Sequence, residues 1–380
     1  MAMDRLFQLM KEKSASDMFF AINSPVHIKI NGNLIPINQQ KLERDNIMAL
    51  LAEVATPAQM AELDRESELN MGISVPNLGR FRLSAFRQRG SISAVFRFVP
   101  ANIPALDDLG LPAILSELIM EKRGLLLLVG ATGSGKSTTI ASMLDHRNEL
   151  RAGHILTLED PIEYLFKNKK SIVNQREIGS DTTSFYTALR NSMRQAPDCI
   201  LIGEIRDKET MAAALAYAQS GHLVLATLHA NNSYNALNRI ISFYPIENRA
   251  ALLQDLSSAV KAIVSQRLVR SAAGGTRQAA VEIMVNTRYV ADLIEKGDIG
   301  QIKEAMEKSL SPGSQTFESA LYDLVKSGLV SQEEALANAD SATNLLWLLN
   351  NATDVKPPEP EETLKAPEDS ASFTEFTLNS

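Results

Sequence analysis

One stretch, residues 124–139 (GLLLLVGATGSGKSTT), constrains the fold of this chain more than any other. Residues 125–129 form a short apolar run with the length of a buried parallel strand. The run leads directly into residues 130–137, which match the phosphate-loop pattern G-x-x-x-x-G-K-[ST] at every fixed position. A chance glycine-rich turn would explain neither the Lys-Ser pair nor the strand before it. The sequence therefore predicts a strand, a phosphate-binding loop and a helix within an α/β fold.

The residue types of this loop suit a nucleotide. Glycines let backbone N–H groups curl around phosphates, Lys136 can reach the β and γ oxygens, and the Ser137 hydroxyl can ligate Mg²⁺. We therefore expect ATP or GTP to bind here. The expected nucleotide-binding residues are Gly130, Ala131, Thr132, Gly133, Ser134, Gly135, Lys136, Ser137 and Thr138.

Composition limits the remaining possibilities. A chain of 380 residues with 45% hydrophobic content is long enough for two domains with sizeable cores. No N-terminal signal pattern and no apolar run long enough to span a membrane is visible, so we expect a cytoplasmic protein. Cys199 is the only cysteine, and its apolar neighbours indicate a buried strand thiol. The net charge of −7 argues against a general nucleic-acid binder.

Residues 1–100 indicate a small α+β domain. The pair Asn31-Gly32 lies between two apolar segments and predicts a tight hairpin. Thr56 and Pro57 predict the start of a helix, because threonine caps helices and proline fits the first helical position.

Two further strands of this domain form what we call the arginine hairpin, residues 80–97. Phe81, Leu83 and Ala85 alternate with arginines, so apolar and basic side chains should lie on opposite faces. The hairpin holds no acidic residue and five arginines: Arg80, Arg82, Arg87, Arg89 and Arg97. Either these arginines are simply solvated, or they form a basic surface that faces phosphate.

The rest of the chain divides into a linker, a main domain and a tail. Prolines place the linker at residues 101–112, and the main domain follows over 113–350. Alternating strands and helices there predict a parallel sheet with crossover helices. Residues 351–380 are expected to be a disordered acidic tail, with seven acidic residues against two lysines.

Particular elements of the main domain can be placed by pattern. The expected strands are 125–129, 155–158, 199–203, 223–228 and 281–285. A long helix is expected over 249–270. Helices expected to form a C-terminal packing appendage cover 287–296, 302–308 and 316–326.

Carboxylates follow two of these strands. Glu204 directly follows the expected strand 199–203. Its carboxylate could ligate Mg²⁺ together with Ser137, or it could polarise an attacking water. In LEDPIEY, Glu159, Asp160 and Glu163 could take a proton from water or merely form an acidic turn. His222 and His229 bracket a strand and would share one end of it only if it is short or twisted.

The motifs GATGSGKST, LEDPIEY, NQRE, MRQAPDCILIGEIRD and SGHLVLATLHAN follow one another in fixed order. In this the chain resembles the secretion-superfamily motor ATPases, most closely the PilT/PilU-type pilus retraction ATPases, over residues 1 to about 350. The resemblance implies a PAS-like N-terminal domain and a RecA-like ATPase domain with C-terminal helices. It also implies a homo-hexamer that hydrolyses ATP with Mg²⁺ to retract type IV pili in twitching motility, at the cytoplasmic side of the inner membrane.

The same resemblance implies roles for particular residues. Lys136 and Ser137 belong to Walker A, Glu163 is the general base, Glu204 is the Walker B residue, and His222 with His229 form the His box. Arginines in the GRFR segment, Arg80 and Arg82 here, are thought to approach the γ-phosphate. The linker directly follows the arginine hairpin, so the N-terminal domain can swing relative to its own phosphate loop. We therefore expect the arginines of the hairpin to act on the nucleotide of a neighbouring subunit.

Departures and rivals complete the sequence-based reading. The segment YVADLIE departs from the AIRNLIR-like segment of PilT-type chains. The stretches EAMEKSLSPGSQTF and EEALANADSATNL resemble the PilU branch, an accessory motor that would work with a PilT-like ATPase and a PilC-like platform protein. The nearest alternative is a pilus assembly or type II secretion ATPase. Proteins of those groups usually carry a tetracysteine zinc element, which a chain with one cysteine cannot build. A RecA-like nucleic-acid translocase is a further alternative, which the negative charge disfavours.

Overall fold

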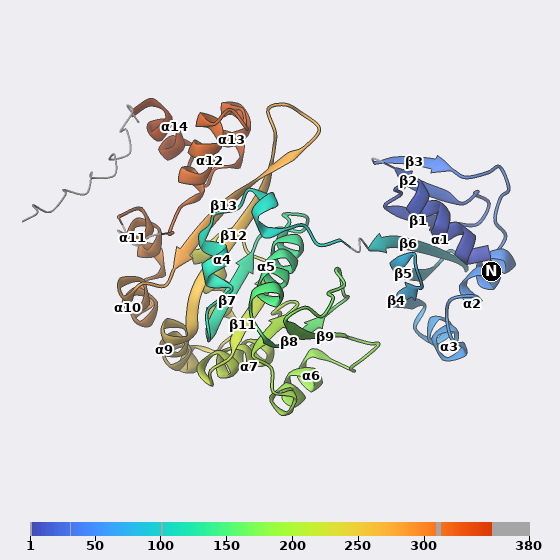
Figure 1. Ribbon diagram of the computed structural model, residues 1–380, viewed down its shortest axis with the longest axis horizontal. Helices are drawn as coiled ribbons and strands as arrows, with labels where there is room; N and C mark the ends of the chain where they lie inside the picture. The colour runs from blue at the N-terminus through green and yellow to red at the C-terminus, as the bar shows by residue number, and fades with distance from the viewer. Residues whose placement is uncertain (1, 31, 100–101, 309–312, 352–380) are drawn as a thin grey trace, which may run out of the picture.

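The chain contains two β-sheets, each with its own buried core. The computed structural model describes residues 2–30, 32–99, 102–308 and 313–351. Figure 1 shows the N-terminal sheet and its helices, in blue, beside the larger domain, with the last helices, in red, on the far side of that domain. The mixed α/β class predicted from the sequence is confirmed.

The N-terminal sheet has six antiparallel strands in the order β3-β2-β1-β6-β5-β4. Its strands are β1 (Asp17–Phe20), β2 (His27–Ile30), β3 (Asn33–Pro36), β4 (Glu68–Val75), β5 (Gly79–Gln88) and β6 (Ser91–Val99). Its helices are α1 (Ala2–Glu12), α2 (Arg44–Ala52) and α3 (Pro57–Glu66).

Aromatic packing holds the helices on one face of this sheet. Phe7 of α1 stacks on Phe81 of β5 with ring centroids 4.1 Å apart. Thr56 caps α3 through the backbone N–H of Gln59, as its sequence predicts. Strands β2 and β3 form the expected hairpin, although Asn31 lies outside the described residues. The opposite face of β5 carries the arginines.

The larger sheet has seven strands in the order β13-β12-β7-β11-β10-β8-β9. Its strands are β7 (Gly124–Val129), β8 (Gly153–Glu159), β9 (Ser171–Glu177), β10 (Cys199–Ile202), β11 (Leu223–Leu228), β12 (Val260–Arg270) and β13 (Arg277–Val285). All neighbours are parallel except β12 and β13. All five strands expected from the sequence are therefore present.

Helices cover both faces of this sheet. Those up to the last strand are α4 (Ile114–Leu118), α5 (Lys136–Leu150), α6 (Phe185–Ser192), α7 (Lys208–Gln219), α8 (Ser233–Ser242) and α9 (Arg249–Ala259). Those after it are α10 (Arg288–Lys296), α11 (Ile302–Lys308), α12 (Phe317–Lys326), α13 (Gln332–Asn338) and α14 (Ala342–Asn351). Alternate side chains of β7 enter the two cores, which is why its run of leucines is continuous.

The expectation of one long helix over residues 249–270 is wrong. The helix ends at Ala259, and β12 begins at Val260 as the second strand from the edge of the sheet, between β7 and β13. Val260, Ile263 and Val264 are β-branched and buried, and backbone pairing on both sides outweighs their modest helix propensity.

Part of the expected linker packs against the larger domain. Leu106 begins a short 3₁₀-helix (Leu106–Leu109) and is buried in the core beneath α5. Ser142 Oγ of α5 donates a hydrogen bond to the Pro104 carbonyl at 2.7 Å. The expected acidic tail lies outside the described residues, apart from Asn351, which ends α14.

Helix α12 packs on β13 and α13 packs on β12, whereas α10 and α11, which were expected to belong to the same appendage, pack into the main core. Phe317 of α12 and Leu345 of α14 share a small core with Val269. Arg267 of β12 lies over the Phe317 ring at 3.9 Å and forms an ion pair with Asp340. These contacts tie the last three helices to the edge of the sheet.

Candidate active site

The phosphate loop occupies the turn between β7 and α5. Gly133 and Gly135 have φ of +79° and +90°, in the left-handed region that side chains rarely adopt. Lys136 begins α5, and its Nζ donates hydrogen bonds to the carbonyls of Gly130 at 2.7 Å and Ala131 at 2.8 Å. The lysine side chain therefore folds back across the phosphate loop and is held there by two backbone carbonyls of the loop.

Burial and charge act in opposite directions on Lys136. Burial lowers the pKa of its ammonium group, and the nearby carboxylates of Glu204 and Glu163 oppose that shift. Ser134 Oγ is also buried and has no hydrogen-bond partner within the described part of the chain. A buried lysine and an unsatisfied hydroxyl in one glycine-rich loop suit an anionic ligand that accepts hydrogen bonds.

A cavity of 240 Å³ lies in front of this loop, at the carboxyl ends of the parallel strands. The predicted site residues that line it are Thr132, Gly133, Lys136, Ser137, Glu163, Glu204 and His229. The structure thus brings Walker A residues, both predicted carboxylates and one histidine around one space.

Glu204 follows β10 and is only 17% exposed at its side chain. Arg206 Nη2 lies 2.7 Å from Glu204 Oε2, and His229 Nε2 lies 3.5 Å from Glu204 Oε1. Arg206 also approaches Asp160 at 4.0 Å. Sequence reasoning missed Arg206, although the motif ILIGEIRD places it two residues after Glu204.

Glu159 and Glu163 differ in environment although they belong to one motif. Glu159 is buried, and burial raises the pKa of its carboxyl group despite hydrogen bonds from Thr157 and Gln175. Glu163 is exposed and lines the cavity. Of these two glutamates, Glu163 is therefore the one that can meet a water molecule, and the exposed carboxylate of Asp160 lines the same cavity.

The expectation that His222 shares the site with His229 is wrong within one chain. The two histidines lie at opposite ends of β11 (Leu223–Leu228), which spans about 20 Å at the usual rise per residue. His222 packs edge-on against Tyr217 and lies within 3.1 Å of Ser220 Oγ, away from the cavity. A six-residue strand is too long for its two flanking residues to meet.

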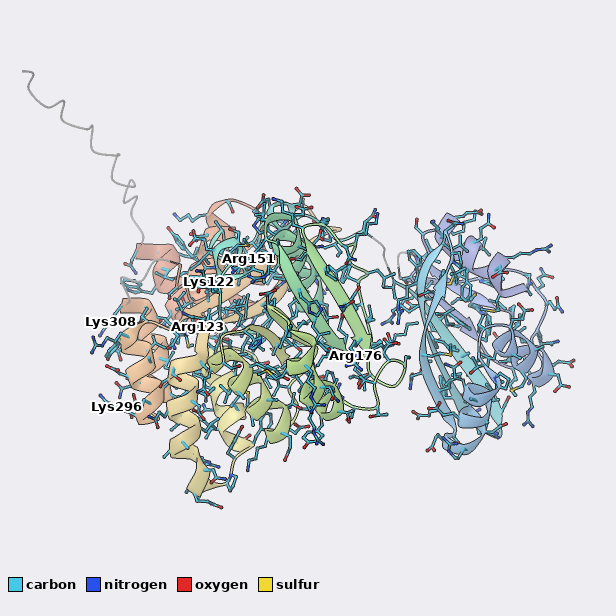
Figure 2. All side chains as sticks on the ribbon, turned by 60° about the horizontal axis from the view of Figure 1, so that its bottom comes forward. Lys122, Arg123, Arg151, Arg176, Lys296 and Lys308 are labelled. Atoms are coloured by element: carbon cyan, nitrogen blue, oxygen red, sulfur yellow. The ribbon has the colours of Figure 1, made fainter. Side chains whose placement is uncertain are left out.

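Arg80 and Arg82 lie on the face of β5 that is turned toward the larger domain. Arg80 forms an ion pair with Glu177, at the end of β9 in the same chain. Arg82 and Glu163 line a second cavity of 200 Å³ between the domains. Arg176, the neighbour of Glu177, is labelled in Figure 2 on the side of the larger domain nearest the N-terminal domain.

The acidic partners of the arginine hairpin come from distant parts of the chain. Besides the Arg80–Glu177 pair, Arg97 pairs with Asp17 at 2.7 Å and Arg87 with Asp64 at 2.5 Å. The absence of acids between residues 80 and 97 therefore did not predict a free basic surface, because tertiary contacts supply the counter-charges.

The donor set at the cavity suits Mg²⁺. Mg²⁺ prefers oxygen ligands and keeps several waters, so one hydroxyl and one carboxylate are sufficient protein contacts. Ser137 and Glu204 provide these at the cavity wall. Within the described residues, no group of three or more His, Cys, Asp or Glu side chains is arranged to hold a metal ion.

Comparison with protein families shows what class of protein this is. The family model described as type II/IV secretion system protein matches residues 2–322. The chain belongs to this family.

Individual relatives narrow the class to the PilT/PilU-type pilus ATPases. The type IV pilus ATPase PilU of Pseudomonas aeruginosa is 46% identical over 349 residues, which cover 92% of this chain and 91% of PilU. The retraction ATPase PilT of the same organism is 37% identical, over 90% of this chain and all (100%) of PilT.

Solved structures agree with this placement. The crystal structure of the pilus retraction motor PilT with bound ADP matches with a TM-score of 0.84 and 38% identity, over 90% of this chain and 97% of that one. The ATPase DotB of Legionella pneumophila matches with a TM-score of 0.79 and 27% identity, over 88% and 94% of the two chains. The fold is that of a secretion ATPase with an N-terminal domain.

Among the described helices, none is long and apolar enough to cross a membrane.

Proposed function

We propose that this chain is a motor ATPase of type IV pilus retraction that works as a PilU-like accessory motor. The observation that carries the proposal is the single cavity that holds Lys136, Ser137, Glu163 and Glu204. The 46% identity to PilU over nearly the whole chain supports the assignment to the PilU-like accessory motors and not to the PilT-like motors. Hydrolysis of ATP needs a phosphate clamp, a metal ligand and a base, and the cavity walls offer all three.

Each side chain has a proposed role. Lys136 holds the β and γ oxygens of ATP, and Glu163 takes the proton of the attacking water from the exposed side of the cavity. His229 lies beside Glu204, and its proposed role is to hold the Glu204 carboxylate in position. Thr138 contributes through its hydroxyl, which lies 2.8 Å from the Tyr164 hydroxyl in the loop of Glu163.

Ser137 and Glu204 are the proposed contacts of Mg²⁺, one directly and one directly or through water. The ion would supply charge neutralisation between the β and γ phosphates. Arg206 contacts Oε2 of Glu204, so Oε1 is the oxygen that can serve the ion while this pair is intact, and Oε2 becomes free only when the pair opens. Arg206 would then be free to turn toward Asp160.

The assembly and location are also proposals. We propose a homo-hexamer at the cytoplasmic side of the inner membrane, in contact with a PilC-like platform protein and a PilT-like ATPase. The support is the relationship to PilU and PilT, whose printed names are those of pilus ATPases. We expect no nucleic-acid partner, in line with the net charge of −7.

Deletion and complementation in the bacterium of origin test this function. Loss of twitching and of pilus retraction under load, restored by the wild-type chain but not by Lys136→Ala, is expected. Loss of pilus assembly instead would favour the assembly-ATPase alternative. ATPase activity stimulated severalfold by DNA would favour the translocase alternative.

A further inference from the structure

The carboxylate of Glu177 joins the two domains. Glu177 ends β9 and is 2% exposed. Its Oε2 accepts hydrogen bonds from the Ile162 backbone N–H at 3.0 Å and from the Arg80 guanidinium. Its Oε1 accepts from the Gly72 N–H at 3.2 Å and the Ser180 hydroxyl at 3.3 Å. One buried side chain thus bonds two strands of the N-terminal domain and two loops of the larger domain, one before β9 and one after it.

The loop in question carries the proposed general base. Ile162 is buried and immediately precedes Glu163, which is exposed at the cavity that also contains Lys136. The hydrogen bond from Ile162 to Glu177 therefore fixes the backbone one residue before Glu163. Glu177 itself does not line the cavity that contains Lys136, so a change at Glu177 would reach Glu163 through the backbone of Ile162.

Gly72 provides the space for this contact. A Cβ at this position would lie 2.1 Å from Arg80 Nη2 and 2.9 Å from Glu177 Oε1. Its φ is outside the left-handed region, so space and not backbone conformation requires glycine here. Any larger residue would have to displace the guanidinium from the carboxylate.

Arg82 is placed differently although it is two residues away on the same strand face. Its side chain makes no hydrogen bond or ion pair with any other residue that the structure describes, and it lines the interdomain cavity with Glu163. Its cross-strand neighbour Arg97 is already paired with Asp17. The two arginines of the GRFR segment therefore differ in their surroundings. Arg80 is ion-paired with Glu177, whereas the Arg82 side chain faces the interdomain cavity and can bind a ligand.

We propose that Arg80, Gly72 and Glu177 form a latch through which the position of the N-terminal domain sets the loop of Glu163. Arg80 is then a positioning residue that acts through Glu177, whereas Arg82 is left to meet the nucleotide. When the N-terminal domain moves away, the buried carboxylate loses its cation and its Gly72 donor. It must then relax toward solvent or another donor, which releases the Ile162 amide. The catalytic consequence rests on the proposed function of Glu163, but the latch itself does not.

Hydrogen exchange of the nucleotide-free, full-length protein tests the latch without activity. Arg80→Ala should speed amide exchange in the loop 160–164 by about tenfold, since the ion pair that holds Glu177 is lost. Arg82→Ala is the matched control: it removes the same charge from the same strand face and should leave exchange in this loop unchanged. Equal loop exchange in the wild type and Arg80→Ala would overturn the proposal.

A second variant keeps every charge. Gly72→Ala should speed exchange in the loop as Arg80→Ala does, because the added methyl group displaces the guanidinium. Gly300→Ala is its control, since a Cβ at Gly300 meets no atom within 4 Å. Thermal unfolding of each variant checks that the domains remain folded. No change in Gly72→Ala, with the protein folded, would reject the steric part of the latch.

Steady-state kinetics test the catalytic consequence. Arg80→Ala and Gly72→Ala should lower kcat by about tenfold to a hundredfold while KM for ATP changes little, because the base is displaced but the phosphate loop is not. Arg80→Lys should restore part of kcat. Faster loop exchange with unchanged kcat would reject positioning of the base. A Lys136→Ala variant that still hydrolyses ATP would instead reject the proposed function.

Discussion

At the scale of single residues, the site depends on charges held close to one another in a partly buried space. Lys136 is 9% exposed, and burial lowers the pKa of its ammonium group against the opposing effect of two carboxylates. Phosphate oxygens would add to that favourable charge. The balance between burial and counter-charge is therefore where substitutions should have the largest effect.

Lys136→Ala should abolish ATP hydrolysis. The variant removes the cation that the phosphate loop presents to the β and γ oxygens, and in-loop hydrogen bonds to Gly130 and Ala131 are lost with it. Phosphate release by the purified, folded protein is the measurement. Lys170→Ala, an exposed lysine beyond the cavity, is the control and should behave as the wild type. Wild-type turnover in Lys136→Ala would disprove the site.

Glu163→Gln should separate binding from chemistry. The substitution keeps the shape of the side chain and removes its basicity, so kcat should fall by about 10² to 10⁴ while ATP binding persists. Binding of a fluorescent ATP analogue and single-turnover hydrolysis measure the two effects. If binding is lost as well, Glu163 holds the ligand or the metal and is not the base.

At the scale of elements, β12 connects the nucleotide-binding sheet to the C-terminal helices. Gln266 of β12 accepts a hydrogen bond from Thr139 of α5 at 2.8 Å, and the next residue, Arg267, pairs with Asp340. Asp340 Oδ2 also accepts from Asn232 at 2.8 Å and from the Tyr234 hydroxyl at 3.0 Å. Asp340 therefore adds a polar link from the last helices to β12 and α8, beside the apolar core that they share with the sheet.

Asp340→Ala should destabilise this C-terminal layer by about 2 kcal/mol, because it removes charge-assisted hydrogen bonds and leaves Arg267 without its partner. Trp347 of α14 is the single tryptophan, so its fluorescence during urea unfolding reports on this layer. Glu307→Ala, on the exposed side of α11, is the control.

The effect should depend on pH. Burial would raise the pKa of Asp340, but hydrogen bonds and charge from Arg267, with hydrogen bonds from Asn232 and Tyr234, outweigh it and hold the pKa below its usual range. A carboxyl group with a lowered folded-state pKa stabilises the fold above its unfolded pKa of about 3.9, and this is lost as the pH falls through the folded value. The difference between wild type and variant should therefore be full near neutral pH and shrink below about pH 4.

At the scale of the whole molecule, the two domains are joined by the Glu177 latch and by the cavity that Arg82 and Glu163 share. Arg80 is already paired within its own chain, so Arg82 is the arginine of this pair that remains for a neighbouring subunit. The in-trans expectation from the sequence therefore stays a prediction for Arg82.

Mixed rings should reveal whether Arg82 acts across a subunit boundary. Arg82→Ala subunits keep the phosphate loop, and Lys136→Ala subunits keep the arginine, so a mixed hexamer contains complete sites only if the arginine acts in trans. Recovery of ATPase activity on mixing is expected. Mixed hexamers, verified by native mass spectrometry, that stay inactive would show that the arginine serves its own subunit.

Truncation after Asn351 should leave the fold and ATP hydrolysis unchanged. The removed residues are rich in Pro, Glu, Ser and Thr and poor in the apolar side chains that a core requires. The melting temperature should stay within about 3 °C of the wild type. A larger fall would show that the tail packs on the described part of the chain.

The sequence by itself determined whatever depends on neighbours along the chain. The loop before Lys136 could be predicted because its glycines, lysine and serine are contiguous, and Thr56 predicted a helix start because a cap acts within one turn. Glu163 and Glu204 could be assigned to one site because parallel strands end at the same edge of a sheet.

Only the tertiary structure decided what depends on residues far apart in the chain. Val260 starts a strand because two other strands flank it, and Arg80 is neutralised because Glu177, 97 residues later in the chain, folds against it. Likewise, His222 is separated from His229 by the strand that both flank. Local patterns record backbone propensity and spacing, whereas counter-charges and strand partners are set by packing, and packing brings together residues that no local pattern connects.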